Sequence, residues 1–286
     1  MNENVSIPGG NLVVVEFDEG IAWVALNRPD KRNAMNPALN QEMLEVLDAL
    51  EVDERCGLVV ITGSGDSYSA GMDLKEFFRE SDRLPPEAWA QISRVAQTWQ
   101  IERLRHYPKP TIAMVNGWCF GGAFNSVVSC DLAIAAEEAE FGLSEVNWGI
   151  IPAGNVLKSV ASVMSARDGL YYSLTGETFD GRRAAEMKLV NIAVPRAVLR
   201  ERTRALARTL LSKNRAAVRA AKHAFRRVGA MSWDDSEDYL AAKLDQLRLT
   251  DPEGGRNEGM RQFLDEKSYR PGLGGYQRDK DRSNPR

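Results

Sequence analysis

Two stretches decide how this chain folds: Ser69-Ala70-Gly71-Met72-Asp73-Leu74 (residues 69–74) and Asn116-Gly117-Trp118-Cys119-Phe120-Gly121-Gly122-Ala123 (residues 116–123). Each follows a short β-branched run, 58–62 or 111–115, and opens toward a helical pattern. Glycine at such a junction lets the backbone approach a ligand, and the free amides of a first helical turn point at it. A lone junction is usually only a turn, but the pair indicates a place where a developing negative charge is held.

The segments around these junctions alternate between strand and helix patterns. Apolar runs 12–17 and 21–26, separated by Asp18-Glu19-Gly20, predict a β-hairpin. Apolar residues at helical spacing predict amphipathic helices over 36–50 and 87–104. Further strands are expected at 131–136 and, more briefly, at 140–141, and the helical pattern dominates from 156 to about 264. This alternation predicts an α/β fold with a parallel sheet, followed by a mainly helical part.

The composition excludes several classes of function. Of the 286 residues 43% are hydrophobic and 27% are charged, with 37 basic and 40 acidic residues and a net charge of -3. This balance is that of an ordinary globular protein and disfavours nucleic acid or a membrane as partner. There is no secretory pattern and no apolar run long enough to cross a bilayer. Three cysteines without CxxC spacing favour a reduced, cytoplasmic protein and disfavour a metal site.

Motifs in order along residues 10–265 resemble those of the enoyl-CoA hydratase (crotonase) family. They are Asn27-Arg28-Pro29-Asp30-Lys31-Arg32-Asn33-Ala34-Met35, the segment 62–73, Lys109-Pro110-Thr111-Ile112-Ala113, Leu174-Thr175-Gly176 and the segment 184–190. The resemblance implies a crotonase-like spiral of ββα units over residues 1–200 and a helical trimerisation region over 201–267. It also implies a homotrimer or a dimer of trimers. Residues 268–286 are poor in apolar side chains, so we expect this tail to be partly mobile.

The same resemblance assigns roles to the glycine junctions. The main-chain amides of Met72 and Gly122 would hold the oxygen of an acyl-CoA thioester, and their hydrogen bonds strengthen as an enolate forms. Coenzyme A is part of the substrate, so no separate cofactor is expected. The residues assigned to substrate binding are Lys31 and Arg32, whose charges suit the phosphates of coenzyme A, together with Ala70, Leu74, Phe77 and Trp148.

Acidic side chains distinguish the members of this family. Its hydratases carry two glutamates, and here the first position holds Asn125, which we count among the catalytic candidates, whereas the second holds Glu145. Glu145 lies in an apolar stretch where desolvation raises the pKa of a carboxyl group. It is therefore the candidate acid and base.

Several segments, among them 72–76, 114–122, 145–150 and 237–246, are similar to the hydroxycinnamoyl-CoA (feruloyl-CoA) hydratase-lyases of this family. Those enzymes hydrate the double bond of an arylpropenoyl-CoA and cleave the product into an aromatic aldehyde and acetyl-CoA. The group has serine at the position of Asn125, and tyrosines that contact the substrate phenol at the positions of Phe77 and Ala241. These departures predict a modified acyl pocket, for an aryl or alkyl group without a para-hydroxyl. Tyr239 is a candidate replacement partner.

Other functions are weighed against this one. An enoyl-CoA hydratase or a double-bond isomerase with a modified acyl pocket is the alternative enzyme. A non-catalytic acyl-CoA-binding relative is disfavoured by the presence of Glu145, and an RNA-binding relative by the absence of a basic stripe.

Overall fold

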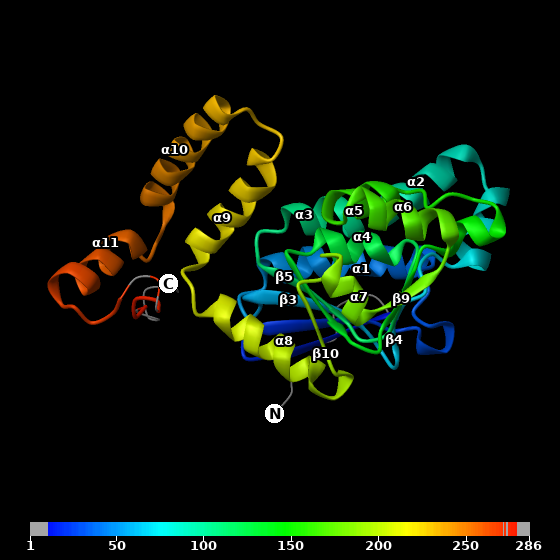
Figure 1. The fold of residues 1–286 in the computed structure, drawn as a ribbon, viewed down its shortest axis with the longest axis horizontal. Coiled ribbons are helices and arrows are strands. Elements are labelled where there is room, and N and C mark those ends of the chain that lie inside the picture. Colours follow the sequence, from blue (N-terminus) through cyan, green and yellow to red (C-terminus); the bar gives the residue numbers. More distant parts are fainter. Residues whose placement is uncertain (1–10, 271, 273, 279–286) are drawn as a thin grey trace. The chain divides into compact units, whose positions relative to one another are not determined.

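The computed structural model describes residues 11–270, 272 and 274–278 of the chain. The chain divides into two compact units, residues 1–207 and 208–286 (Figure 1). The candidate site residues, with the exception of Tyr239, belong to the first unit. None of the helices in the described part of the chain is long and apolar enough to cross a bilayer.

A six-stranded sheet forms the centre of the first unit. Its strand order is β1-β2-β3-β5-β7-β10. The strands are β1 (Val13–Asp18), β2 (Ile21–Leu26), β3 (Leu58–Gly63), β5 (Thr111–Val115), β7 (Leu132–Ala136) and β10 (Ile192–Val194). Only β1 is antiparallel to its neighbour, and the other pairs are parallel. Every residue of β3 and β5 is buried, as expected for parallel strands covered on both faces.

The predicted hairpin and the predicted strands are confirmed. Glu19 and Gly20 connect β1 to β2 with φ values of 53° and 82°, which is the left-handed backbone of a two-residue hairpin turn. The predicted run 111–115 is β5 itself, and β7 begins one residue after the predicted start at residue 131.

A second, smaller sheet has the order β4-β6-β8-β9. Its strands are β4 (Ser67–Ser69), β6 (Trp118–Phe120), β8 (Glu140–Gly142) and β9 (Thr178–Asp180). The strands β4, β6 and β8 directly follow β3, β5 and β7, so each turn of the chain adds one strand to each sheet. Strands of three residues are too short for an alternating pattern, which is why sequence analysis did not find β4, β6, β9 and β10.

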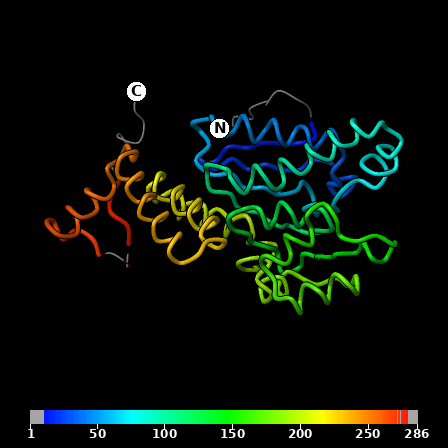
Figure 2. The backbone as a smooth tube through the Cα atoms, turned by 90° about the horizontal axis from the view of Figure 1, so that it is seen from above, coloured from blue at the N-terminus to red at the C-terminus, as the bar shows by residue number. Residues whose placement is uncertain are grey.

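The helices of the first unit pack around these sheets. They are α1 (Pro37–Val52), α2 (Pro86–Gln97), α3 (Leu104–His106), α4 (Ala123–Ser129), α5 (Val156–Val163), α6 (Ala166–Thr175), α7 (Gly181–Glu186) and α8 (Arg196–Leu211). Figure 1 shows α3, α4 and α5 on one side of β3 and β5. Figure 2 shows the first strands, in blue, and the residues around 150, in green, on opposite sides of this unit.

The first helix begins where the sequence predicts. The side chain of Asn36 caps α1 by accepting a hydrogen bond of 2.9 Å from the Leu39 amide, and Pro37 occupies the first turn. The second predicted helix is continuous from α2 to α3 but contains a π-helical segment, η4 (Thr98–Arg103). Hydrophobic periodicity does not distinguish that segment from the α-helix around it.

The second unit is helical, with α9 (Arg215–Val228), α10 (Trp233–Thr250), α11 (Gly255–Met260) and the π-helical segment η6 (Arg261–Asp265). Arg278, near the end of the described chain, forms an ion pair with Glu253, and its guanidinium donates to the carbonyl of Lys213. This part of the tail is therefore bonded to its own unit. Residues 271, 273 and 279–286, for which mobility is also predicted, lie outside the described residues.

Candidate active site

The two glycine junctions meet in space. A Cβ atom built on each glycine shows how close the two junctions are. The atom built on Gly71 would lie 3.3 Å from the Gly122 nitrogen, and the atom built on Gly122 would lie 3.7 Å from the Met72 nitrogen. Gly71 has a φ of 89°, and its missing side chain would also meet the Phe120 carbonyl at 2.7 Å. Only glycine permits this close approach of the two backbone segments.

In the first junction, the amides on both sides of Met72 are used within the protein. The Gly71 amide donates to the Ser69 hydroxyl at 3.1 Å, and the Asp73 amide donates to the Met35 carbonyl at 3.0 Å. Within the described residues no protein acceptor takes the Met72 amide. This one amide of the loop is left available to a ligand.

The second junction has the same arrangement. The Gly121 amide donates to the Gly142 carbonyl at 3.1 Å, and the amide of Phe124 bonds back to Gly121. The Gly122 amide has no protein acceptor in the part of the chain that the structure describes. Two unused amides from separate loops therefore lie side by side, an arrangement suited to an oxygen that gains negative charge.

Hydrogen bonds and an ion pair hold the Met72 loop in place. Met72 pairs with Met35 in an isolated parallel bridge. Asp73 then caps the π-helical segment η2 (Leu74–Arg79) by accepting from the Lys75 amide at 3.0 Å and from the Glu76 amide at 2.9 Å. The same carboxylate forms an ion pair of 2.9 Å with Arg28, and both side chains are about nine-tenths buried.

Glu145 lies in the 3-10 segment η5 (Ser144–Trp148), directly against the second glycine junction. A Cβ atom on Gly121 would lie 2.7 Å from one carboxylate oxygen of Glu145, and the φ of Gly121 is 49°. The side chain is buried, and its Oε2 has no hydrogen-bond partner among the described residues. Burial raises the pKa of Glu145 above its usual value, although a bond to its own backbone works in the opposite direction.

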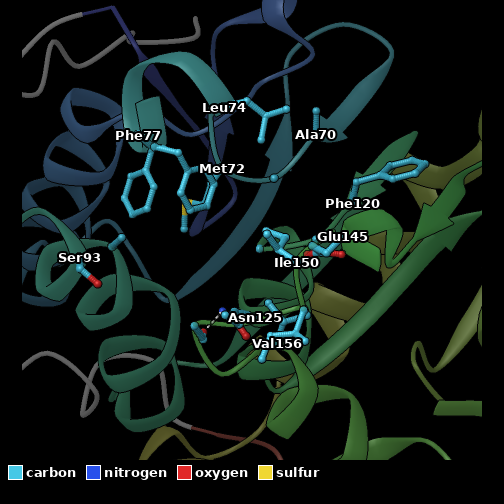
Figure 3. Close-up of a pocket in the computed structure, with 18 of the residues that line it drawn as sticks. Ala70, Met72, Leu74, Phe77, Ser93, Phe120, Asn125, Glu145, Ile150 and Val156 are labelled. Carbon is cyan, nitrogen blue, oxygen red and sulfur yellow. Dashed lines mark hydrogen bonds between the residues drawn. The ribbon is translucent and has the colours of Figure 1, made fainter. Parts of the chain in front are cut away.

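These groups open into one cavity of about 310 Å³, a size that suits a small ligand. Of the eleven predicted site residues, eight line it: Ala70, Met72, Leu74, Phe77, Gly122, Asn125, Glu145 and Trp148. Figure 3 shows Glu145 and Phe120 on one side of this pocket and Phe77 and Ser93 on the other. Most of the remaining wall is apolar, with Phe78, Trp89, Ala96, Ile150, Ile151 and Val156.

The structure gives Asn125 specific partners. Its Nδ2 donates to the Gly154 carbonyl at 2.8 Å, and its Oδ1 accepts from the Ser159 hydroxyl at 2.8 Å. Asn125 is buried and joins α4 to the residues before and within α5. Its amide is thus engaged in holding the pocket wall, and a catalytic role for it stays a prediction.

The predicted residues that do not line this cavity are Lys31, Arg32 and Tyr239. Lys31 is exposed and lines a neighbouring surface hollow together with Ala70, Met72 and Leu74. The Arg32 guanidinium lies 3.8 Å from the centre of the Trp118 ring, a cation–π contact. Tyr239 is part of α10 in the second unit.

One wall of the pocket was not predicted from the sequence. It is formed by one face of α2 and η4, with Trp89, Ser93, Ala96, Gln97 and Gln100. These residues recur at intervals of three or four, so they share one side of a helix. The spacing was visible in the sequence, but a mixed polar and apolar face gives no sign that it borders a cavity.

Metal binding finds no support here. In the described ranges no three His, Cys, Asp or Glu side chains gather in a way that could hold a metal ion.

Comparison with known proteins identifies the architecture. A family model described as enoyl-CoA hydratase/isomerase matches residues 16–270. The hydroxycinnamoyl-CoA hydratase-lyase of Pseudomonas fluorescens is 58% identical over 266 residues, which cover 93% of this chain and 96% of that protein. The 2,3-dehydroadipyl-CoA hydratase of Escherichia coli K12 is 30% identical over 90% of this chain and 96% of its own length.

Solved structures agree with these matches. The crystal structure of an enoyl-CoA hydratase from Mycobacterium smegmatis superposes with a TM-score of 0.82 at 26% identity, covering 90% of this chain and 97% of that one. The enoyl-CoA hydratase from Bacillus anthracis gives a TM-score of 0.80, also at 26% identity, covering 89% of this chain and 96% of that one. The two sheets, the paired glycine junctions and these matches together establish that this chain belongs to the enoyl-CoA hydratase/isomerase family and has the crotonase fold.

Proposed function

We propose that this protein is a hydratase-lyase that converts an arylpropenoyl-CoA and water into an aromatic aldehyde and acetyl-CoA. One observation carries the proposal: two unused main-chain amides lie beside a single buried carboxyl group, at the wall of one largely apolar cavity. The identity of 58% to a protein named hydroxycinnamoyl-CoA hydratase-lyase supports the choice among the reactions of the family.

In the first step water adds to the double bond. The thioester oxygen accepts hydrogen bonds from the amides of Met72 and Gly122, which lowers the energy of an enolate. The Glu145 carboxylate takes a proton from water as the water oxygen bonds to Cβ, and the electrons of the double bond move into the enolate. Glu145 then returns the proton to Cα, and the β-hydroxyacyl thioester results.

In the second step the same groups break a carbon–carbon bond. The Glu145 carboxylate removes the proton of the β-hydroxyl, the Cα–Cβ bond breaks, and the aldehyde leaves. The enolate of acetyl-CoA remains on the two amides until Glu145 protonates its Cα. Burial raises the pKa of Glu145, which makes its protonated form easier to reach than in an ordinary glutamate and suits a group that takes and gives the same proton.

The surroundings of the pocket complete the proposal. Lys31, at the mouth of the neighbouring hollow, is assigned to the phosphates of coenzyme A. The two steps move only protons between Glu145 and the substrate, so they call for no cofactor beyond the thioester itself. We further propose a cytoplasmic location and an assembly of three or six chains.

Product analysis tests the function. Purified protein is incubated with cinnamoyl-CoA and with crotonyl-CoA, and the mixture is analysed for free aldehyde, acetyl-CoA and the β-hydroxyacyl thioester. Formation of aldehyde and acetyl-CoA in equal amounts is the expected result. Accumulation of a stable β-hydroxyacyl-CoA without aldehyde would instead identify an enoyl-CoA hydratase, and migration of a double bond would identify an isomerase.

A further inference from the structure

One polar side chain in the pocket wall has no role in the steps above. Gln100, in the π-helical segment η4, is 1% exposed and lines the cavity. Neither its Nε2 nor its Oε1 has a hydrogen-bond partner in the described part of the chain. A buried primary amide without partners is unfavourable, and native proteins rarely retain one without a function.

The other polar side chains of this wall are already paired. The Gln97 amide donates to the Ser93 hydroxyl at 3.3 Å, and its Oε1 accepts from the Asn155 amide at 3.2 Å. Asn125 bonds to Gly154 and Ser159, as described above. Among the described residues that line the cavity, only Glu145 and Gln100 therefore have buried side-chain polar atoms without a partner.

Gln100 borders the cavity, and its amide atoms are covered by protein atoms, so a ligand contact requires its side chain to turn toward the cavity. The residue lies one helical turn after Ala96 and Gln97 on the face of α2 and η4 that lines the cavity. Figure 3 shows Ser93, on this same helical face, across the pocket from Phe120 and Glu145. A π-helical turn shifts the side chains that follow it and is often found at functional sites.

We propose that Gln100 is a specificity-determining residue that hydrogen-bonds a hydroxyl group on the aryl part of the substrate. A hydroxyl satisfies both ends of the amide, because its oxygen accepts from Nε2 and its proton is donated to Oε1. A carboxylate would satisfy only Nε2, and its charge would be costly in an apolar pocket that already holds Glu145.

This inference rests on the proposed function and replaces the expectation of an acyl group without a hydroxyl. That expectation depended on Phe77 and Ala241, which carry no polar group. Gln100 supplies a polar contact from a different element. The comparison of substrates below identifies which ring position carries the hydroxyl.

The test compares substrates that differ by one hydroxyl. The value of kcat/KM is measured with cinnamoyl-CoA, 3-hydroxycinnamoyl-CoA, 4-hydroxycinnamoyl-CoA and 4-methoxycinnamoyl-CoA, for the wild-type protein and for Gln100→Met. Methionine has nearly the same length and shape but makes no such hydrogen bonds. Gln41→Met is the matched control, because Gln41 lies on the exposed face of α1 and its side chain bonds, within the described residues, only to Glu45.

The wild-type protein is expected to prefer one hydroxylated substrate over cinnamoyl-CoA by about 10- to 100-fold. Gln100→Met should remove this preference by lowering the value of kcat/KM for the preferred hydroxylated substrate. Gln41→Met should keep it. The methoxy compound, which can only accept, should fall between the two.

Three results would overturn the assignment of Gln100: no preference for any hydroxylated substrate, a preference that survives in Gln100→Met, or a Gln100→Met protein with a clearly lowered Tm. The last would mean that the amide is already bonded within the protein. In each case release of an aldehyde from cinnamoyl-CoA would leave the proposed function standing. If no aldehyde forms from any of the four thioesters, the proposed function fails and takes this inference with it.

Discussion

At the scale of single residues, the environment of Glu145 sets its chemistry. The side chain is buried beside Gly121, and one of its oxygens has no partner among the described residues. Desolvation penalises the charged form and so raises the pKa. The charged form of such a carboxyl group lowers the stability of the folded protein, and the raised pKa suits the group to proton transfer.

Replacement of Glu145 by glutamine should abolish the reaction while sparing the fold. We expect kcat to fall by about 10² to 10⁴-fold, because no other carboxyl group lines the described pocket. The Tm should stay the same or rise, since a buried carboxylate with one unpartnered oxygen is removed. Steady-state rates and thermal unfolding measure both effects, and a variant with near wild-type kcat would exclude Glu145 as acid and base.

The pH profile of the wild-type protein follows from the same shift. Because the pKa of Glu145 is raised, its carboxylate form is lost at a higher pH than for an ordinary glutamate. The acid limb of kcat/KM should therefore lie above pH 4.5, the ordinary value for this group. A limb at or below that pH would contradict the assignment.

Gly121 leaves space for this carboxyl group. In Gly121→Ala the new Cβ would lie 2.7 Å from the Glu145 Oε1, and alanine is strained at a φ of 49°. We expect kcat to fall by about 10-fold or more, since a small displacement of a proton-transfer group is costly. Gly229→Ala is the control, because a Cβ there meets nothing within 4 Å, and it should keep full activity.

At the scale of elements, the loop that carries Met72 depends on the start of η2. Asp73 accepts two main-chain amides and pairs with Arg28. Burial alone would raise the pKa of Asp73, but the hydrogen bonds from the Glu76 amide and the Arg28 guanidinium outweigh it, so the pKa is lowered. A lowered pKa means stability that is present at neutral pH and is lost as the pH falls through the folded-state value.

Asp73→Ala should destabilise the protein by about 3–5 kcal/mol, because it leaves the buried Arg28 charge without this partner and removes a cap. It should also lower kcat/KM, since the Met72 amide loses its support. Ser232→Ala is the control: Ser232 caps α10 through an exposed bond of 3.2 Å to the Asp235 amide. It should cost about 1 kcal/mol and leave the rate unchanged. Urea denaturation distinguishes the two, and equal losses would contradict this account.

At the scale of the whole molecule, the helices of the second unit carry exposed apolar side chains. Phe225, Trp233 and Leu249 are 81%, 90% and 87% exposed in the single chain. Large apolar side chains exposed to this degree are candidates for contact with another chain. They are the physical reason to expect an oligomer.

We therefore expect analytical ultracentrifugation to give three or six times the mass of one chain. Trp233→Glu should shift the distribution toward smaller species, because a charge replaces an apolar contact. Val52→Glu, a similar change at an 81% exposed residue in the first unit, should not. A monomeric wild-type protein would contradict the expected assembly.

The sequence by itself determined the parts of this protein that depend on neighbours along the chain. Repeating apolar residues predict α1 and the strands β1, β2, β3, β5 and β7 of the large sheet, and Asn36 marks the start of the first helix. The two glycine junctions and the apolar surroundings of Glu145 are also local features. Hydrophobic periodicity and turn chemistry act over a few residues, so they can be recognised without the fold.

Only the tertiary structure decided which groups meet and which are left without partners. The Met72 and Gly122 amides are 50 residues apart in the chain. The Gln100 amide has no partner among the described residues, whereas its neighbour Gln97 bonds to Ser93 and Asn155. Asn125 likewise acquires its partners, Gly154 and Ser159, by packing of α4 against α5. A hydrogen bond across the pocket depends on distances between elements, and the pattern of letters along one element contains no such distance.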